Sequence, residues 1–569
     1  MGQHHRPYGH FQPRKGDEEQ QQQQNGPQQV QRACCEVSCG GVKKARPRLL
    51  RLVLVFCLVS CSFLFGPRLL FGADSNPLPF FLYSFGSAED NAGLPIGGIA
   101  DGGLNSRVPC SSVPDNSICC DRTSSIRTDV CVLRGDVRTR SSASSIFLYS
   151  AASSSAEPVP AGSSRKLSNH SFPAPLVEKI RPYTRKWETS IMDTVEELNL
   201  VVRRDTAGGD THKCDVVHGV PAVVFSTGGY TGNVYHEFND GIIPLYITSR
   251  RYNRRVVFVM LEYHSWWVTK YGDILSRLSA YPPVDFSSDK RTHCFPEATV
   301  GLRIHDELAV DATLMPGNGT ILDFRQLLDD AYRPRIRDLE QEEAQEGEKA
   351  KPEAKEEVPQ VPSVGTDAPK LVIISRNGSR GIENEKELVE LCEEIGFQVD
   401  VVRPDRTSEL AKIYRALNAS DAMIGVHGAA MTHLLFMRPG SVFIQVVPLG
   451  TDWAAQTYYG DPAVKMGLKY VAYKILPRES SLYAQYAKDD PVLTDPKSVT
   501  SQGWQMTKKI YLDGQTVKLD LNRFLKRLTR AYQHIVARKM GDASLSWNEN
   551  WLPRQQRERR EQQRRSARR

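Results

Sequence analysis

The stretch LVIISRNGSRGIENEKELVELCEEIGFQVDVV, residues 371–402, has the pattern of one β-α-β unit. Its apolar ends predict two buried strands, and between them Leu388, Leu391 and Ile395 share one face of a helix. The alternation continues to residue 448, through a helix in SELAKIYRALNAS, a strand in DAMIGVHG, a helix in AAMTHLLFM and a strand in SVFIQVVP. Strands and helices in this order predict a parallel, doubly wound sheet and therefore an α/β fold.

Two predicted strands of this block end in small or cationic residues. His427, Gly428 and Ala429 open the helix after one strand, where free N–H groups favour an anion such as a phosphate. Arg376 and Arg380 follow another strand, and guanidinium groups suit a diphosphate. Because ligands of such sheets lie beyond the carboxyl ends of the strands, we expect these five residues to form an anion site. The structural alternatives are a tight turn with a core-packed histidine, and surface salt bridges.

Several common signatures do not occur in the sequence. It has no Gly-x-Gly-x-x-Gly or Gly-Lys-Ser/Thr loop, which argues against dinucleotide-binding proteins and NTPases, and no Gly-x-Ser-x-Gly elbow of an α/β-hydrolase. It also lacks an Asp-x-Asp pair, the metal-binding signature of one class of nucleotide-sugar enzymes. A fixed cationic cluster can stabilise a leaving diphosphate without a metal, so we expect no metal requirement.

A second chemical centre falls in GGYTGNVYHEFNDGIIPLYIT, residues 228–248, which follows another predicted strand and a Gly turn. If two α/β domains face each other, this segment would lie across a cleft from the anion site. His236 and Asp240 stand one helical turn apart on one face, whereas Glu237 points elsewhere. We favour His236 as a general base oriented by Asp240, with a carboxylate as the base left as an open alternative. Helix capping and a local salt bridge are the structural alternative.

The N-terminal part of the chain predicts a membrane anchor. An apolar run follows a cluster of basic residues and lies far from Met1 for a cleaved signal peptide, so we expect a type II topology.

An acidic, proline-containing segment, residues 338–367, separates the two predicted α/β regions. It predicts a surface insertion or linker, with an exposed helix rich in ion pairs as the alternative. The predicted order is a cytoplasmic tail (1–48), a transmembrane signal anchor (49–71), a flexible lumenal stem (72–175), an acceptor-side α/β domain (176–337), the acidic insertion (338–367), a donor-binding α/β domain (368–540) and a basic tail (541–569).

Cysteines and glycosylation motifs agree with a secretory route. Seven of the twelve cysteines follow the predicted anchor, so in an oxidising lumen some should pair, and at least one should stay free or pair between chains. Asn169, Asn318 and Asn418 are candidate N-glycosylation sites. Asn377 also matches, but we expect it to stay bare because it adjoins Arg376. The net charge of +7 lies largely in the tails, and we expect no nucleic-acid binding.

Taken together, three segments resemble glycosyltransferase family 61. They are VPAVVFSTGGYTGNVYHEFNDGIIPLYITSR, LVIISRNGSR, and DAMIGVHGAAMTHLLFMRPGSVFIQVVP with TDWAAQTYYGDPA after it, and the likeness spans residues 180–540. The resemblance is closest to the plant branch that decorates cell-wall xylan. It implies a GT-B fold, in which two Rossmann-like domains face a cleft, behind a single membrane anchor. The acidic segment matches no common element of the family.

The resemblance also implies a reaction. An enzyme of this branch would transfer a pentose, arabinofuranose or xylose, with inversion from a UDP-sugar to xylan or another glycan. It would work in the Golgi membrane without a cofactor, possible partners being other Golgi glycosyltransferases. By motif, Arg376 and His427–Gly428 fall at the donor diphosphate, and His236, Glu237 and Asp240 fall on the acceptor side. The alternatives are an N-glycan core or mucilage-type xylosyltransferase of the same family, and a non-catalytic scaffold in a Golgi xylan synthase complex.

Overall fold

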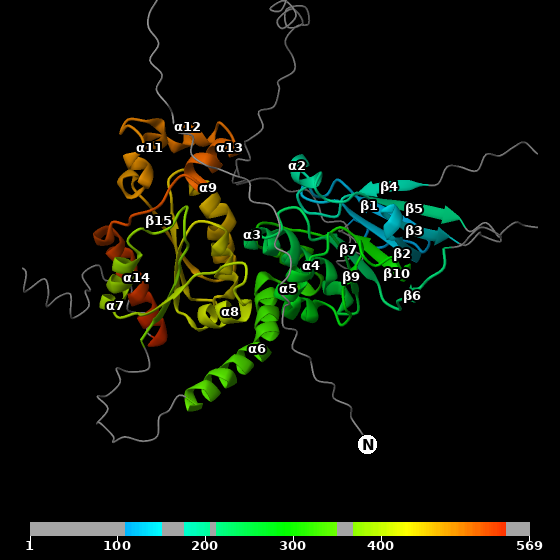
Figure 1. Cartoon of the computed structure of the whole chain (residues 1–569), viewed down its shortest axis with the longest axis horizontal. Coiled ribbons are helices and arrows are strands. Elements are labelled where there is room, and N and C mark those ends of the chain that lie inside the picture. The colour runs from blue at the N-terminus through cyan, green and yellow to red at the C-terminus, as the bar shows by residue number, and fades with distance from the viewer. Residues whose placement is uncertain (1–108, 151–175, 205–211, 350–367, 542–569) are drawn as a thin grey trace, which may run out of the picture. The chain divides into compact units, whose positions relative to one another are not determined.

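The computed structural model of the chain describes residues 109–150, 176–204, 212–349 and 368–541 (Figure 1). These residues fall in one compact unit that contains two β-sheets. We call the described residues up to 349, which carry the first sheet, the N-terminal lobe, and residues 368–541, which carry the second, the C-terminal lobe. Both lobes combine strands with helices, which confirms the predicted α/β class.

The N-terminal lobe is built on a ten-stranded mixed sheet. Its order is β4-β5-β3-β2-β10-β7-β8-β9, with β1 paired to β2 and β6 paired to β10. Strands β10, β7, β8 and β9 run parallel, whereas β2 joins β10 and β3 antiparallel. The strands are β1 (Ser117–Asp121), β2 (Val130–Arg140), β3 (Ser145–Ser150), β4 (Val177–Ile180), β5 (Leu198–Arg204), β6 (Val216–Val217), β7 (Ala222–Ser226), β8 (Val257–Leu261), β9 (Val284–Asp285) and β10 (His293–Val300), accompanied by helices α2 (Thr189–Met192) and α5 (Ser265–Leu278).

The prediction of a flexible stem over residues 72–175 is wrong for residues 117–150. They form β1, β2 and β3, and the last two lie in the interior of the sheet between β5 and β10. The surrounding serine-rich composition conceals short apolar runs in which Leu133 and Leu148 are fully buried. The N-terminal lobe therefore begins well before residue 176. The remainder of the predicted stem, 72–108 and 151–175, lies outside the described residues.

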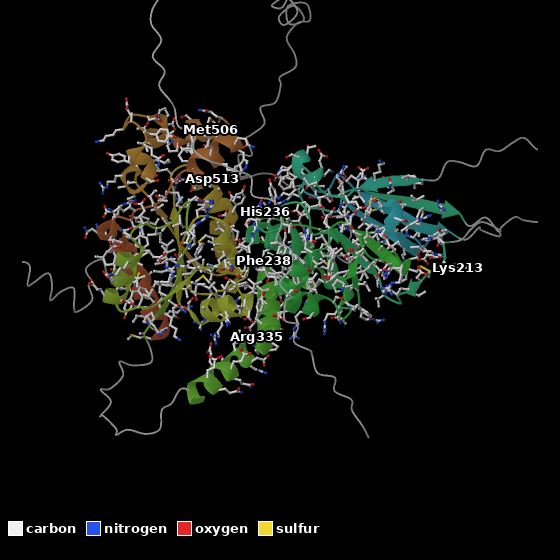
Figure 2. All side chains as sticks on the ribbon, viewed as in Figure 1. Lys213, His236, Phe238, Arg335, Met506 and Asp513 are labelled. Carbon is white, nitrogen blue, oxygen red and sulfur yellow. A yellow bond between two sulfur atoms is a disulfide. The ribbon has the colours of Figure 1, made fainter. Side chains whose placement is uncertain are left out.

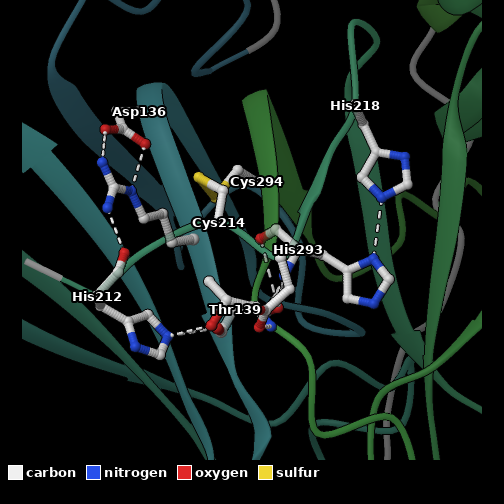
Figure 3. Close-up of a disulfide and its surroundings, with 10 residues drawn as sticks. Asp136, Thr139, His212, Cys214, His218, His293 and Cys294 are labelled. Carbon is white, nitrogen blue, oxygen red and sulfur yellow. Dashed lines mark hydrogen bonds and ion pairs between the residues drawn. A yellow bond between two sulfur atoms is a disulfide. The ribbon is translucent and has the colours of Figure 1, made fainter.

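All seven cysteines beyond the predicted anchor are described, and six of them are paired. The disulfides are Cys110–Cys119, Cys120–Cys131 and Cys214–Cys294. The third joins the segment before β6 to strand β10 (Figure 3). Cys392 is free and buried. The prediction that at least one of the seven does not pair within the chain is therefore confirmed.

The helix that carries His236 and Asp240 is present in three parts. It begins with α3 (Val234–His236), continues as a π-helical turn over Glu237–Ile242 and ends with α4 (Ile243–Ser249). The Asn233 side chain caps the first part, because its oxygen accepts a hydrogen bond from the N–H of the second helical residue. The π-helical turn contains Glu237 and Asp240 and directly follows His236, and such turns are frequent at functional sites.

The predicted acidic insertion begins inside a long helix. Helix α6 runs over Ile321–Lys349, so residues 338–349 are helical rather than a linker, which corrects the predicted boundary. Surface ion pairs tie this polar helix to the C-terminal lobe, for example Glu343 with Arg415 at 2.6 Å. The alternative of an exposed helix with ion pairs therefore holds for this part. Residues 350–367 lie outside the described residues.

The C-terminal lobe has the predicted doubly wound sheet. Five parallel strands follow the order β12-β11-β13-β14-β15, one strand more than the four predicted. The helix predicted over AAMTHLLFM is a 3-10 helix, Ala429–Phe436. The elements are β11 (Lys370–Ile374), α7 (Glu385–Ile395), β12 (Gln398–Val402), α8 (Leu410–Ala419), β13 (Ala422–Val426), β14 (Val442–Val447), α9 (Asp452–Ala455), α10 (Asp461–Lys465), β15 (Lys469–Lys474), α11 (Pro491–Thr494), α12 (Pro496–Thr500), α13 (Trp504–Thr507) and α14 (Leu521–Lys539).

The predicted membrane anchor cannot be compared with the structure. Residues 49–71 and the tail 1–48 lie outside the described residues, as do residues 542–569. Within the part of the chain that the structure describes, no helix combines the length and apolar character needed to cross a membrane.

One hydrophobic core joins the two lobes. A single cluster of buried side chains draws members from α4, α5 and α6 and from β11, α8 and the 3-10 helix. At its centre the ring of Phe238 lies 6.0 Å from that of Phe436. Figure 2 shows His236 and Phe238 on the side of the N-terminal lobe next to the C-terminal lobe. The candidate base residues therefore lie at the junction of the lobes.

Candidate active site

The predicted pair of His236 and Asp240 is formed. His236 Nδ1 lies 2.6 Å from Asp240 Oδ2. Tyr230, from the preceding Gly turn, stacks on the imidazole with ring centroids 4.1 Å apart. When Nδ1–H donates to the carboxylate, the Nε2 atom of His236 is left as the acceptor that can take a proton from a substrate.

Asp240 is a positioning residue because it is too deeply buried to touch a substrate. Arg185 Nε donates to its Oδ2 at 2.8 Å, and Asn239 Nδ2 donates to its Oδ1 at 2.8 Å. Burial alone would raise the pKa of Asp240, but the hydrogen bond with His236 and the charge of Arg185 hold that pKa below its usual value. Asp240 is therefore ionised and holds the imidazole of His236 in one orientation.

Glu237 points away from this pair, as predicted. Its carboxylate accepts hydrogen bonds from the Gly232 N–H at 2.7 Å and from the indole N–H of Trp267. Burial raises the pKa of Glu237 to about 7. The residue lines a pocket of about 560 Å³ that both lobes share, with Ala429 and Ala430 on the C-terminal side. A carboxyl group with this pKa can exchange protons near neutral pH, so Glu237 stays a second candidate base.

The predicted anion-site residues converge on Gly428. A Cβ atom there would lie 2.4 Å from Arg376 Nη1 and 3.4 Å from Arg380 Nη1, and the φ of 154° is one that side chains with a Cβ rarely adopt. The Nε atoms of both arginines are buried without a hydrogen-bond partner, and neither guanidinium group has an ion-pair partner among the described residues. Two largely buried cations in this state form a site for an anion.

Both arginines remain charged despite their burial. Burial lowers the pKa of Arg376, and burial together with the charge of Arg376 lowers the pKa of Arg380 to about 10. Since this value is well above neutrality, the two guanidinium groups are cationic under ordinary conditions.

His427 joins the anion site as a neutral hydrogen-bond donor. Burial and then the charges of Arg380 and Arg376 lower the pKa of His427 to about 3. Tyr470 OH donates to Gln445 Oε1 at 2.7 Å, and Gln445 Nε2 donates to His427 Nδ1 at 3.0 Å. Because Nδ1 accepts this bond, the proton of the neutral ring lies on Nε2, where it can be donated to an anionic oxygen.

Aromatic side chains connect the His236 pair to the anion site. The Tyr235 ring lies 5.2 Å from the His236 ring and 5.8 Å from the Tyr459 ring. The Tyr459 ring in turn lies 5.5 Å from the ring of His427. The structure therefore brings the two predicted centres together across the junction of the lobes.

Several residues of the site were not predicted from the sequence. Arg185 orients Asp240, Gln445 sets the tautomer of His427, and Tyr459 bridges the two centres. Tyr459 lies in the segment TDWAAQTYYGDPA that carries the resemblance, so its position held a signal. Gln445 lies in SVFIQVVP, which also carries the resemblance, so its position held the same signal. Arg185 lies in none of these segments and acts on a residue that is distant in the chain, so it had no such signal.

The disulfide region of the N-terminal lobe is structural. Asp136, Cys214 and Cys294 form the one group of possible metal ligands within the described ranges, but the two sulfur atoms are bonded to each other and offer no thiolate (Figure 3). Nearby, His218 Nε2 lies 2.9 Å from His293 Nδ1. These contacts hold β10 to the segments beside it.

The candidate glycosylation sites differ in their surroundings. Asn318 is exposed in a short turn, whereas Asn418 is half-buried in α8 and its side-chain oxygen accepts a hydrogen bond from α6. Asn169 lies outside the described residues. Asn377 is exposed within the turn that carries Arg376, so a glycan there would stand beside the anion site.

A proton acceptor next to a cluster of anion-binding groups suits an enzyme that activates an acceptor hydroxyl and expels an anionic leaving group. The chain belongs to glycosyltransferase family 61, since the family model for glycosyltransferase 61 matches residues 108–444. It is therefore a glycosyltransferase. The match begins just before β1, in agreement with the corrected start of the N-terminal lobe.

Similar proteins align with this chain over most of its length. The xylan glycosyltransferase MUCI21 of Arabidopsis thaliana is 53% identical over 499 residues, which cover 87% of this chain and 94% of that protein. The beta-1,2-xylosyltransferase XYXT1 of Oryza sativa subsp. japonica is 35% identical over 422 residues, covering 74% of this chain and 84% of the relative. The alpha-1,3-arabinosyltransferase XAT3 of the same plant is 34% identical over 413 residues, covering 72% and 64%.

Proposed function

We propose that this chain is an inverting pentosyltransferase that moves arabinofuranose or xylose from a UDP-sugar onto xylan during cell-wall biosynthesis. The observation that carries the proposal is a histidine base positioned at the same lobe junction as two partly buried arginines that have no ion-pair partner among the described residues. The names of the three relatives, which specify xylan, xylosyl transfer and arabinosyl transfer, support the substrate class. The pocket shared by the two lobes supports a GT-B arrangement.

In the proposed reaction His236 Nε2 takes the proton of the acceptor hydroxyl. The acceptor oxygen forms a bond to the anomeric carbon on the face opposite the UDP group while the bond from that carbon to the diphosphate oxygen breaks. The electron pair of the broken bond leaves with UDP. Arg376, Arg380 and the Nε2–H of His427 stabilise the negative charge that UDP gains. Asp240 keeps its charge and stabilises the imidazolium that forms.

We also propose that the reaction needs no divalent metal and no other cofactor. Arg376 and Arg380 supply two fixed positive charges at the predicted diphosphate position, which is the role that a metal ion plays in other nucleotide-sugar enzymes. Addition of a chelator should leave the rate of transfer unchanged. A rate that disappears with chelator and returns with a divalent ion would contradict this part of the proposal.

The proposed location is the Golgi membrane, with both lobes in the lumen and other Golgi glycosyltransferases as possible partners. The apolar segment 49–71 behind basic residues supports a type II anchor. The three disulfides support an oxidising compartment. In intact microsomes the lobes should resist added protease until detergent opens the vesicles.

A donor and acceptor screen tests the reaction. The full-length chain is incubated with UDP-xylose, UDP-arabinofuranose or UDP-N-acetylglucosamine, against xylo-oligosaccharides or an N-glycan, and the products are measured by mass. We expect a pentose on the xylo-oligosaccharide. Transfer to the N-glycan instead would favour the N-glycan xylosyltransferase alternative. Folded protein that does not bind UDP would overturn the nucleotide-sugar site.

Substitutions connect the activity to the proposed residues. His236→Ala should lower the rate of transfer by about 10²–10⁴-fold with UDP binding retained, because a general base contributes in this range. His427→Ala should lower it by about 10²–10³-fold, the usual effect of losing one donor to a developing charge. His534→Ala, in α14 and outside the site, is the matched control. Equal activity in all three variants would contradict the assignment.

A further inference from the structure

Exposed tryptophans surround the candidate site. Of the five tryptophans within the described ranges, only Trp267 is buried, whereas Trp453 is 67% exposed and Trp187 is 45% exposed. Tryptophan is highly buried on average in folded proteins, and it is enriched where a protein surface binds a partner.

Trp453 belongs to the C-terminal lobe and is connected to the candidate base by ring contacts. The Trp453 ring lies 5.4 Å from that of Tyr458, at an interplanar angle of 70°. The Tyr458 ring lies 5.3 Å from that of Tyr235, which in turn lies 5.2 Å from His236. Trp453 is therefore exposed to solvent, while the ring contacts that hold it in place lead to His236 in the candidate site.

Trp187 approaches the same base from the N-terminal lobe. Arg185 Cζ lies 5.0 Å from the centre of the Trp187 ring, and Arg185 Nη2 lies 3.2 Å from His236 Nδ1. Arg127 Cζ lies 5.3 Å from the same ring. These cations restrain the indole, because a guanidinium group over an aromatic ring is attracted by its electron-rich face.

We propose that Trp187 and Trp453 are stacking platforms for the sugar rings of the acceptor, which is an extended chain of pyranose residues. A pyranose has an apolar C–H face that can cover an indole and a rim of hydroxyl groups that seek polar partners. Polar groups for such a rim lie near Trp187, because Arg185 Cζ, which contacts the Trp187 ring, also lies 5.9 Å from the Tyr230 ring. Tyr230 OH donates to Glu188 Oε2 at 2.6 Å. This inference rests on the proposed function and specifies how its acceptor is held.

The arrangement has a consequence for the acceptor. Because the two tryptophans come from different lobes and reach His236 by separate contacts, the sugar that receives the pentose lies between two stacked residues. The enzyme should therefore modify an inner residue of the chain and require an acceptor that extends in both directions from it. Short acceptors, which cover one platform at most, should bind weakly.

A series of acceptors from xylobiose to xylohexaose tests the inference with the full-length chain. In the wild type the KM should fall with length. Trp453→Leu, which keeps an apolar side chain but removes the aromatic face, should raise the KM for xylohexaose about tenfold, since an aromatic contact is worth roughly that factor. The KM for xylobiose and the kcat should stay near their wild-type values. Trp187→Leu should act in the same way.

Two further variants separate stacking from folding. Trp453→Tyr keeps an aromatic face and should restore most of the affinity for xylohexaose. Trp504→Leu, at an equally exposed tryptophan of α13 outside this set, should leave the length dependence as in the wild type. A KM for xylohexaose that rises equally in the Trp453 and Trp504 variants would overturn the inference.

Binding without a donor distinguishes this inference from the proposed function. Titration of the intrinsic tryptophan fluorescence with xylohexaose needs no transfer. A dissociation constant for xylohexaose that rises in the two leucine variants would support the platforms even if none of the donors reacts. Transfer to xylan with unchanged KM values in both variants would overturn the platforms and leave the proposed function standing, as would a wild-type fluorescence that does not respond to xylohexaose.

Discussion

Asp240 holds its neighbours in place through charge. Its two oxygens engage His236, Arg185 and Asn239, and its own side chain has no exposed surface. A buried ion pair of this kind is costly to break, because the remaining partner keeps its charge without compensation. The spacing of His236 and Asp240 predicted half of this network, and Arg185 supplied the other half from a loop far away in the chain.

The Asp240→Asn variant should therefore lose both stability and activity. The amide removes one of the two carboxylates that Arg185 contacts and leaves it only Glu188, at 2.9 Å. Loss of the buried pair should cost up to about 3–5 kcal/mol in the free energy of unfolding. It also leaves His236 without the group that orients it, and the rate of transfer should fall by about 10²-fold or more. Urea unfolding and initial rates measure the two effects. Asp338→Asn, at an exposed position of α6, is the control; a variant that remains as stable as this control would contradict the role of Asp240.

Glu237 should make the stability of the protein depend on pH. Its pKa is raised from 4.5 to about 7 in the folded protein, so between these values the folded state holds a proton that the unfolded chain has released. Stability is therefore lost as the pH rises through this window. The glutamine of Glu237→Gln cannot ionise. The free energy of unfolding of this variant, minus that of the wild type, should therefore increase by up to roughly 3 kcal/mol from pH 4.5 to pH 7. A difference that stays constant across the window would contradict the raised pKa.

The strands of the two lobes differ in how well they can be predicted from the sequence. Four strands of the C-terminal lobe are predicted because central strands of a parallel sheet are continuous apolar runs. Strands β1 to β3 are not, because they lie within a serine-rich region and because β2 mixes its apolar residues with arginine, aspartate and threonine. Their pairing in the sheet, and the disulfides beside β1 and β2, become visible only in the folded chain.

Removal of these strands provides a test of the corrected domain boundary. A chain that begins at Leu176 lacks β2 and β3 and therefore leaves β5 and β10 each without the neighbouring strand on one side. Unpaired backbone groups and exposed core side chains should make it insoluble or unfolded. A chain that begins at Ala100 keeps the whole compact unit and should fold. Circular dichroism and gel filtration measure the difference. A folded, monodisperse chain from Leu176 would contradict the boundary.

At the scale of the whole molecule, the two lobes share a core. Phe436, fully buried in the 3-10 helix, packs against Phe238 of the N-terminal lobe and against Tyr332 of α6. Relative motion of domains is expected unless their interface is large and apolar, and here it is continuous with the core. The lobes should therefore unfold together.

Substitution of Phe436 should uncouple them. Phe436→Ala should lower the free energy of unfolding by about 3–5 kcal/mol, as a buried aromatic-to-alanine change usually does. Two spectroscopic probes, one in each lobe, should report a single transition in the wild type and separate transitions in this variant. Phe524→Ala, in a core confined to the C-terminal lobe, should lower stability while the probes stay coincident. Coincident transitions in Phe436→Ala would contradict the coupling.

The sequence by itself determined the α/β class, the parallel sheet of the C-terminal lobe and the types of side chain that form the site. These features depend on local periodicity and on residues placed directly after strands, both of which are properties of short segments. The tertiary structure alone decided that Arg185 binds Asp240, that Gln445 sets the proton of His427 and that Arg376 and Arg380 have no ion-pair partner in the part of the chain that the structure describes. Such contacts join residues far apart in the chain, and they exist only when the two lobes are packed on one core.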